Sequence, residues 1–206
     1  VELLKIVLVG ESGVGKTSII TRFVEKSFEL KQQSTSGGTF STKTVKCSNG
    51  KLINFEIWDT AGQEKYRSLT KMFYKEANAV ILVYDITRKE SFEELETYWS
   101  GQIKECCPKD IILVVAANKS DLYLEEVISE DEGRQFAKEL NALFFFTSAK
   151  NSSGIDSIFT GIAKKYTGFD AVLVEEDDDI SEYRMVRRDS YKITKEKMGK
   201  QKKGCC

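Results

Sequence analysis

The stretch GESGVGKT, residues 10–17, decides the fold, because it lies between an apolar run, KIVLV (5–9), and a stretch with helical periodicity (16–26). It has the GxxxxGK(S/T) pattern of a phosphate-binding loop, in the strand–loop–helix order that this loop requires. Its glycines let backbone N–H groups converge on a phosphate, and the start of the helix adds a partial positive charge. We expect Lys16 to reach the β- and γ-phosphates of a nucleotide and the Thr17 hydroxyl to ligate Mg²⁺. The loop residues expected to contact the nucleotide are Ser12, Gly13, Val14, Gly15, Lys16, Thr17 and Ser18.

Apolar runs of strand length alternate with helical stretches along the chain. The runs typical of central strands covered on both faces are AVILVYD (79–85), IILVVAA (111–117) and LFFF (143–146). Helical periodicity predicts further helices at 67–76, 90–106, 130–140 and 154–166. This alternation is typical of a parallel sheet with helices packed against it.

Two other segments, TFSTKTVKC (39–47) and KLINFEIW (51–58), predict an antiparallel hairpin. They flank Asn49-Gly50, a pair that suits a type I′ turn. We therefore expect an α/β fold with a six-stranded, mostly parallel sheet, one antiparallel edge strand and helices on both faces. A ligand would bind at the carboxyl ends of the strands.

The composition excludes several kinds of chemistry. The chain of 206 residues is 41% hydrophobic and 31% charged, as in a soluble globular protein, and its net charge of -1 gives no overall attraction to nucleic acid. The absence of histidine excludes histidine general bases and histidine-ligated metals, which leaves a metal held by oxygen ligands. Five cysteines in this arrangement, with two sequence-adjacent pairs, are typical of thiols in a reducing compartment. The apolar amino-terminal run is too short to span a membrane.

Two tetrapeptides that follow predicted strands indicate which base the site would select. NKSD (118–121) ends with Asp121, whose carboxylate can accept from both N1–H and the 2-amino group of guanine. Adenine would leave this carboxylate unpaired, so the motif favours guanine. Asn118 is expected to support the loop and reach the purine N7, and the stem of Lys119 to cover the ring. TSAK (147–150) can offer backbone N–H groups to guanine O6, and its expected site residues are Ser148, Ala149 and Lys150.

The stretch WDTAGQE, residues 58–64, supplies groups for the γ-phosphate end of a nucleotide. Asp59 ends a predicted strand, where it is placed to hold Mg²⁺ through water. The Gly62 N–H can approach the γ-phosphate because glycine has no side chain, and Gln63 is expected to be the catalytic residue that orients the attacking water. Phosphoryl transfer depends on positioning and charge neutralisation, so a chain without histidine can catalyse it.

Together these motifs resemble those of the Ras superfamily of small GTPases, over residues 3–167. The resemblance implies the P-loop NTPase (small G-protein) fold, GTP and GDP as bound nucleotides, Mg²⁺ as cofactor and slow intrinsic GTP hydrolysis. It also implies that Phe28 packs on the guanine and that Thr35 ligates Mg²⁺ in the triphosphate state. The expected metal ligands are therefore Thr17, Thr35 and Asp59. Thr35 and Gly62 would both be released after hydrolysis, which makes a switch.

Within the superfamily the chain is similar to the Rab branch, and KMFYKEANAVILVYDIT (71–87) to its early-endosomal subgroup. The resemblance implies an effector-binding patch of Phe40, Trp58 and Phe73; the alternative for these aromatics is ordinary, partly buried core. SGGTF (36–40) departs from the Rab pattern, since Ser36 and Gly38 replace larger apolar residues. This removes contacts that partners would use and raises the entropy cost of ordering the loop.

The chain after residue 167 changes character. Residues 168–206 are expected to form a disordered hypervariable tail behind a GTP-binding domain of residues 1–167. From Ser181 onward the tail holds nine Lys or Arg and three acidic residues, and it ends in Cys205-Cys206, similar to the doubly geranylgeranylated end of Rabs. Lipid chains plus basic charge would hold the protein at the cytosolic face of an intracellular, endosomal membrane, with a soluble cytosolic pool.

The resemblance implies a monomeric, membrane-attached switch in vesicle trafficking. Its expected partners are an exchange factor, a GTPase-activating protein, effectors, a dissociation inhibitor and a prenylation escort protein, and no nucleic acid. A non-cycling module that holds GTP stays open as an alternative, in case the SGGTF loop no longer closes. Asp121 disfavours a third class, the P-loop ATPases and kinases.

Overall fold

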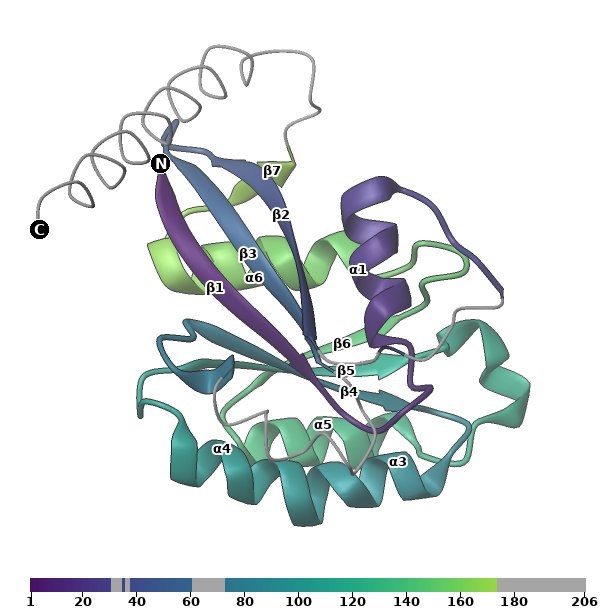
Figure 1. The fold of residues 1–206 in the computed structure, drawn as a ribbon. Helices are drawn as coiled ribbons and strands as arrows, with labels where there is room; N and C mark the ends of the chain where they lie inside the picture. Colours follow the sequence, from purple (N-terminus) through teal and green to yellow (C-terminus); the bar gives the residue numbers. More distant parts are fainter. Residues whose placement is uncertain (31–34, 36–37, 61–72, 174–206) are drawn as a thin grey trace, which may run out of the picture. The chain divides into compact units, whose positions relative to one another are not determined.

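The computed structural model describes residues 1–30, 35, 38–60 and 73–173, and Figure 1 shows a central sheet with helices on both faces. Its strands are β1 (Glu2–Val9), β2 (Gly38–Cys47), β3 (Leu52–Thr60), β4 (Ala79–Asp85), β5 (Ile112–Asn118), β6 (Leu143–Thr147) and β7 (Ala171–Leu173). Its helices are α1 (Lys16–Glu25), α3 (Lys89–Glu94), the π-helical η2 (Leu95–Trp99), α4 (Ser100–Cys106), the 3₁₀-helical η3 (Ser120–Glu125), α5 (Glu130–Glu139) and α6 (Ile155–Thr167). The predicted helix at 67–76 falls mostly outside the described residues.

The sheet has the strand order β6-β5-β4-β1-β3-β2-β7. β1 pairs in parallel with β3 and β4, and β4, β5 and β6 continue the parallel part. β2 pairs antiparallel with β3, as its hairpin requires. The predicted α/β class and the mostly parallel sheet are confirmed.

The predicted strand count is wrong by one, and β2 is not the edge strand along its whole length. After α6 the chain turns at Gly168, with φ 79°, and Ala171–Leu173 pair antiparallel with Val45–Cys47. Three residues are too short to show the period of a strand, so this pairing leaves no pattern in the sequence. The compact unit that contains the sheet runs from Val1 to Leu173, six residues beyond the predicted end of the domain.

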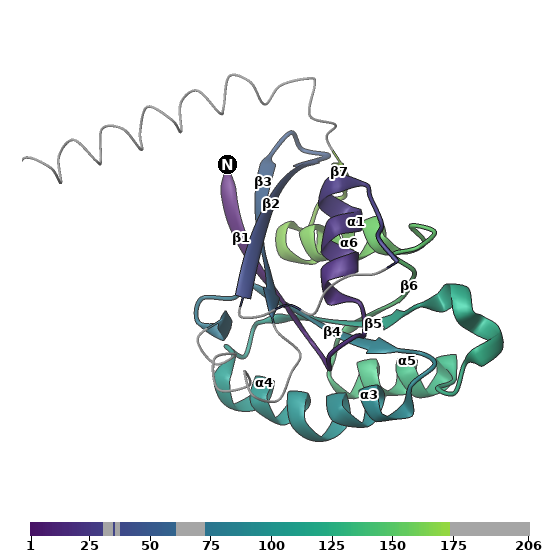
Figure 2. The ribbon, with the colours of Figure 1, turned by 45° about the vertical axis from the view of Figure 1, so that its right-hand side comes forward.

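Each face of the sheet carries its own apolar core. On the face covered by α1 and α6 (Figure 2), Phe23 and Phe159 stack with ring centroids 3.6 Å apart. On the other face, Trp99 and Phe92 pack against the sheet. All seven residues of β4 are buried because both faces of this strand are covered, which explains its uninterrupted apolar sequence.

The hairpin between β2 and β3 does not use the predicted type I′ turn. A type I′ turn centred on Asn49-Gly50 would need a positive φ at both of these residues. Gly50 has one, with φ 83°, but Asn49 is not among the described residues with positive φ. Gly50 N–H donates to the Cys47 carbonyl oxygen at 2.8 Å, and Asn49 Oδ1 accepts from Lys51 N–H at 3.0 Å. The asparagine side chain thus caps the turn from an ordinary backbone conformation.

In the part of the chain that the structure describes, no helix combines the length and the apolar character needed to cross a bilayer.

Candidate functional site

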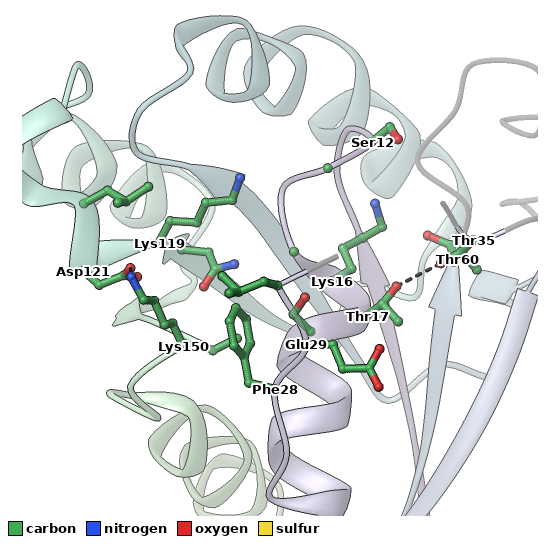
Figure 3. Close-up of a pocket in the computed structure, with 17 residues that line it drawn as sticks. Ser12, Lys16, Thr17, Phe28, Glu29, Thr35, Thr60, Lys119, Asp121 and Lys150 are labelled. Atoms are coloured by element: carbon green, nitrogen blue, oxygen red, sulfur yellow. Dashed lines mark hydrogen bonds and ion pairs between the residues drawn. The ribbon is translucent and has the colours of Figure 1, made fainter. Parts of the chain in front are cut away.

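A pocket of about 380 Å³ opens where the loops after β1, β5 and β6 meet (Figure 3). Most of the residues predicted to contact a nucleotide line it. They are Ser12, Gly13, Gly15, Lys16, Thr17, Ser18, Phe28, Thr35, Asn118, Lys119, Asp121, Ala149 and Lys150. Segments more than 100 residues apart in the sequence therefore form a single site, as expected from the carboxyl ends of parallel strands.

Glycine is required at two positions of the loop between β1 and α1. Gly10 has φ 140°, and a Cβ atom there would overlap the carbonyl oxygen of Val83. Gly15 has φ 98°, and a Cβ atom there would overlap the side-chain amide of Asn118. The loop can therefore lie this close to β4 and β5 only without these side chains. Val14, predicted as a site residue, is fully buried in the core and offers only its backbone.

Lys16 is buried inside this loop, with 5% of its surface exposed. Its Nζ donates to the carbonyl oxygens of Gly10 at 2.8 Å and Glu11 at 2.9 Å. Burial lowers the pKa of Lys16 to about 8, and the negative charges of Asp59 and Glu11 oppose this shift. A phosphate group at the loop would add negative charge next to this poorly solvated ammonium and stabilise its charged form.

Three oxygen-bearing side chains from three segments meet beside Lys16. Thr17 Oγ1 donates to Asp59 Oδ2 at 2.6 Å, and Thr35 Oγ1 lies 2.9 Å from Thr17 Oγ1 and 3.2 Å from the same Asp59 oxygen. Figure 3 shows Thr17 and Thr35 linked in this way. The predicted metal ligands are thus brought together.

These residues fit a hard divalent cation. Asp59 is 3% exposed, and its Oδ1 is buried with no hydrogen-bond partner among the described residues. Burial raises the pKa of the Asp59 carboxyl group, while the Thr17 hydroxyl and the Lys16 charge oppose that rise. A cation, or water bound to it, would satisfy the free oxygen, and two hydroxyls plus a carboxylate are the ligand type that Mg²⁺ prefers.

On the opposite side of the pocket, Asn118 ties the phosphate-binding loop to the loops expected to bind the base. Its Nδ2 donates to the Val14 carbonyl oxygen at 2.7 Å, and its Oδ1 accepts from Thr147 Oγ1 at 3.1 Å. Both ends of the amide are therefore engaged, which fixes its orientation. The predicted support role of Asn118 agrees with this geometry.

Asp121 presents a carboxylate held from one side. Its Oδ1 accepts from Ser148 Oγ at 2.6 Å, and its Oδ2 lies 3.6 Å from Lys150 Nζ. Ser148 is fully buried and its N–H donates to the Ser153 carbonyl oxygen at 2.9 Å, so Ser148 acts here through its hydroxyl rather than its amide. In this part of the chain the amides of Ala149 and Lys150 have no hydrogen-bond partner within the described residues.

Several residues at the site were not among the predicted site residues. Glu29, Leu30, Thr60 and Leu122 also line the pocket. Their sequence signal is only their position next to Phe28, Asp59 and Asp121.

The end of β4 and the turn after it, residues 85–88, bind both loops by ion pairs that sequence reasoning also missed. Asp85, 1% exposed, pairs with Lys119 Nζ at 2.6 Å. Arg88 pairs with Glu11 and donates to the Ser12 carbonyl oxygen at 3.2 Å. A single short segment thus positions a residue of the predicted base-binding loop and two residues of the phosphate-binding loop.

The three aromatics predicted as an effector patch lie together, with Phe40 and Phe73 both next to Trp58. Phe40 stacks on Trp58 with ring centroids 5.4 Å apart, and the ring centroid of Phe73 lies 5.5 Å from that of Trp58. Trp58 and Phe73 are half-buried, whereas Phe40 is 58% exposed, which is unusual for a core phenylalanine. Phe73 also covers Gly38, since a Cβ atom there would lie 2.9 Å from its Cε1 and closer still to its Cζ.

Four predicted functional residues lie outside the described residues. They are Gly62 and Gln63, expected at the γ-phosphate, and Cys205 and Cys206, expected to carry lipid.

Comparison with known proteins matches residues 5–168 to the model of the Ras family. The chain is 42% identical to GTP-binding protein ypt5 of Schizosaccharomyces pombe over 162 residues, which cover 78% of this chain and 76% of that protein. It is 42% identical to Ras-related protein Rab-22A of Homo sapiens over 170 residues, 82% of this chain and 87% of the relative. With Ras-related protein Rab-31 of Rattus norvegicus the identity is 41% over 167 residues, 81% and 85% of the two chains.

Proposed function

The chain belongs to the Ras family of small GTPases, and from this premise we propose that it is a Rab-type switch that cycles between GDP and GTP while attached to a membrane. As a member of this family it is an enzyme that hydrolyses GTP to GDP and phosphate. The proposed role is in vesicle trafficking, at the cytosolic face of an endosomal membrane and with a soluble pool. It would act as a monomer with an exchange factor, a GTPase-activating protein, effectors, a dissociation inhibitor and a prenylation escort protein.

The observation that carries this proposal is the meeting of Thr17 and Thr35 at Asp59. Thr35 belongs to the loop before β2, whereas Thr17 lies in the first turn of α1 and Asp59 lies in β3. A loop residue that shares a cation site with two residues of the scaffold can be ordered or released according to what occupies that site. This is the property that a nucleotide switch needs.

Each of the predicted site residues would have a separate role in phosphoryl transfer. The Thr17 and Thr35 hydroxyls, and Asp59 through water, would hold Mg²⁺, and the bound ion would neutralise charge on the phosphates. Lys16 would bind the β- and γ-phosphates, and Gln63 would orient the attacking water. The intrinsic rate is expected on the order of 10⁻⁴ to 10⁻³ s⁻¹, as for Ras-type GTPases without an arginine finger.

Selection of guanine can be tested by competition titration against fluorescent GDP. The wild type should bind GDP and GTP far more tightly than ATP, by roughly 10⁴-fold, because adenine would leave the Asp121 carboxylate unpaired. Asp121→Asn should shift the preference toward xanthine nucleotides, whose C2 carbonyl needs a donor. Asp156→Asn is the matched control, since Asp156 is exposed on α6 and its carboxylate pairs, among the described residues, only with Lys26. Equal affinity of the wild type for ATP and GTP would exclude guanine selection.

Cycling can be separated from the non-cycling alternative by single-turnover hydrolysis and exchange measurements. A cycling switch should convert bound GTP to GDP slowly and exchange GDP faster once Mg²⁺ is chelated. GTP that stays intact on the wild type over many hours would favour the alternative module. Membrane attachment through Cys205 and Cys206 predicts that replacing both with serine moves the protein entirely to the soluble fraction of cells.

A further inference from the structure

Arg22, on α1, spans the space between this helix and the loop after β6. Its Nε donates to the Ala149 carbonyl oxygen at 2.7 Å, and its Nη2 to the Lys150 carbonyl oxygen at 3.1 Å. Its Nη1 donates to the Lys26 carbonyl oxygen at 2.9 Å, just beyond the end of α1. All three nitrogens of the guanidinium group are therefore engaged, two of them with a loop more than 120 residues away.

The guanidinium group also lies by Phe28, with its central carbon 5.8 Å from the ring centroid. Phe28 lines the pocket, as do Ala149 and Lys150. One side chain outside the pocket thus touches three residues that form its wall. Because the guanidinium group is planar and its donors have a fixed spacing, it imposes one arrangement on the groups that it binds.

Holding a carbonyl oxygen also fixes the amide on the other side of the same peptide. A trans peptide is planar, and its C=O and N–H point in opposite directions. When Arg22 holds the Ala149 carbonyl, it therefore sets the direction of the Lys150 N–H. That N–H has no partner among the described residues, and Lys150 lines the pocket.

The second carbonyl group that Arg22 binds, that of Lys150, is connected through Ser148 to Asp121, the residue expected to select the base. The Lys150 carbonyl shares its peptide with the Asn151 N–H, which donates to Ser148 Oγ at 3.3 Å. Ser148 Oγ in turn donates to Asp121 Oδ1 at 2.6 Å. Arg22 thus fixes one peptide with a free amide at the pocket and a second peptide that supports the Asp121 carboxylate.

We propose that Arg22 is a positioning residue for base recognition, which holds the 148–151 loop so that its free amide and the Asp121 carboxylate meet the guanine edge together. This rests on the proposed function, in which guanine is the base that the pocket selects. Arg22 touches neither base nor phosphate in this role. It acts through the 149–150 and 150–151 peptide groups and the hydroxyl of Ser148.

The test compares the affinities of GDP and ADP, because ADP shares the phosphate contacts but not the guanine contacts. In Arg22→Ala the affinity for GDP should fall by about tenfold or more, the range expected from misplacing one or two hydrogen bonds to the base, while the weak affinity for ADP stays unchanged. The ratio of the two affinities should therefore fall by the same factor. Arg22→Lys keeps the charge but lacks the planar fork, so its ratio should fall close to that of Arg22→Ala.

Arg134→Ala is the matched control, since Arg134 is an exposed arginine that pairs with Glu130 on its own helix. Its ratio should equal that of the wild type. An unchanged ratio in both Arg22 variants would overturn the proposal, and so would a proportional loss of GDP and ADP binding, which indicates a general effect on α1. If Arg22→Ala does not fold, Arg22→Lys decides alone by the same criterion. A wild type without preference for GDP over ADP would refute guanine selection itself, which is a different result.

Discussion

Replacing Gly38 with alanine should change the free energy of unfolding in opposite directions, depending on whether residue 73 is phenylalanine. A Cβ atom at position 38 would lie 2.9 Å from Phe73 Cε1 and closer still to Cζ, where ordinary contacts begin at 3.4 Å, so the ring must shift by well over 0.5 Å. Overpacking of this kind costs about 1–3 kcal/mol. Gly38 does not have a positive φ, so alanine also reduces the entropy of the unfolded chain, which stabilises by about 0.4–1 kcal/mol.

The net loss expected for Gly38→Ala is therefore about 1 kcal/mol in the wild-type background. In a Phe73→Ala background the clash is absent, and the same change should stabilise by about 0.4–1 kcal/mol. Urea unfolding of the four proteins at one fixed GDP concentration measures both values, since bound nucleotide adds equally to each.

Gly101→Ala is the control for this cycle. Gly101 lies in α4 with no atom within 4 Å of a would-be Cβ, so alanine should stabilise by up to about 1 kcal/mol in both backgrounds. If Gly38→Ala has the same effect whether or not Phe73 is present, the ring does not occupy the space over Gly38 and the reasoning is wrong.

Three further results are expected. Asp59→Asn should make GDP dissociate equally fast with and without Mg²⁺, because it weakens the oxygen site at Thr17; a retained Mg²⁺ effect in stopped-flow release would contradict this. Gln63→Leu should slow single-turnover GTP hydrolysis, and an unchanged rate would remove Gln63 from the catalytic group. Burial raises the pKa of Cys107 to about 12 from an ordinary 9.0, so at pH 8 its thiolate fraction should be about 1,000-fold lower. Its alkylation by iodoacetamide, followed by peptide mass spectrometry, should be correspondingly slow, and reaction at the rate of a free thiol would refute the shift.

The sequence predicted the pocket well because its motifs are local. In the tetrapeptides ending in Asp121 and in Lys150, each functional group lies within three residues of a strand end, and the phosphate-binding loop runs directly from the end of β1 to the start of α1. In a parallel sheet with helices on both faces, the carboxyl ends of the strands lie at the same edge. Identifying the strands was therefore enough to predict that these residues meet in one site.

The missed residues that position the site, such as Arg22, Asp85 and Arg88, connect segments far apart in the chain. Arg22 binds carbonyl oxygens of residues 149 and 150, and backbone acceptors have no sequence signature. The same holds for β7 and for the ring of Phe73 over Gly38. From the sequence, Gly38 indicated only a loop that is costly to order, whereas the structure shows that its missing side chain makes room for an aromatic ring.

The short pairing of β7 with β2 sets the length of any tether attached to the carboxyl end of the chain. It consists of three residue pairs, together with a hydrogen bond from Ser48 N–H to the Asp170 carbonyl oxygen, and the Val172 side chain in its middle is 65% exposed. Such a pairing should open long before the sheet does. Opening would move the point of departure from Leu173 back to Gly168, and the released residues span about 17 Å when extended. The greatest distance between the domain and an anchoring surface would therefore differ between the paired and the opened state of β7. The free energy difference between these two states should be small.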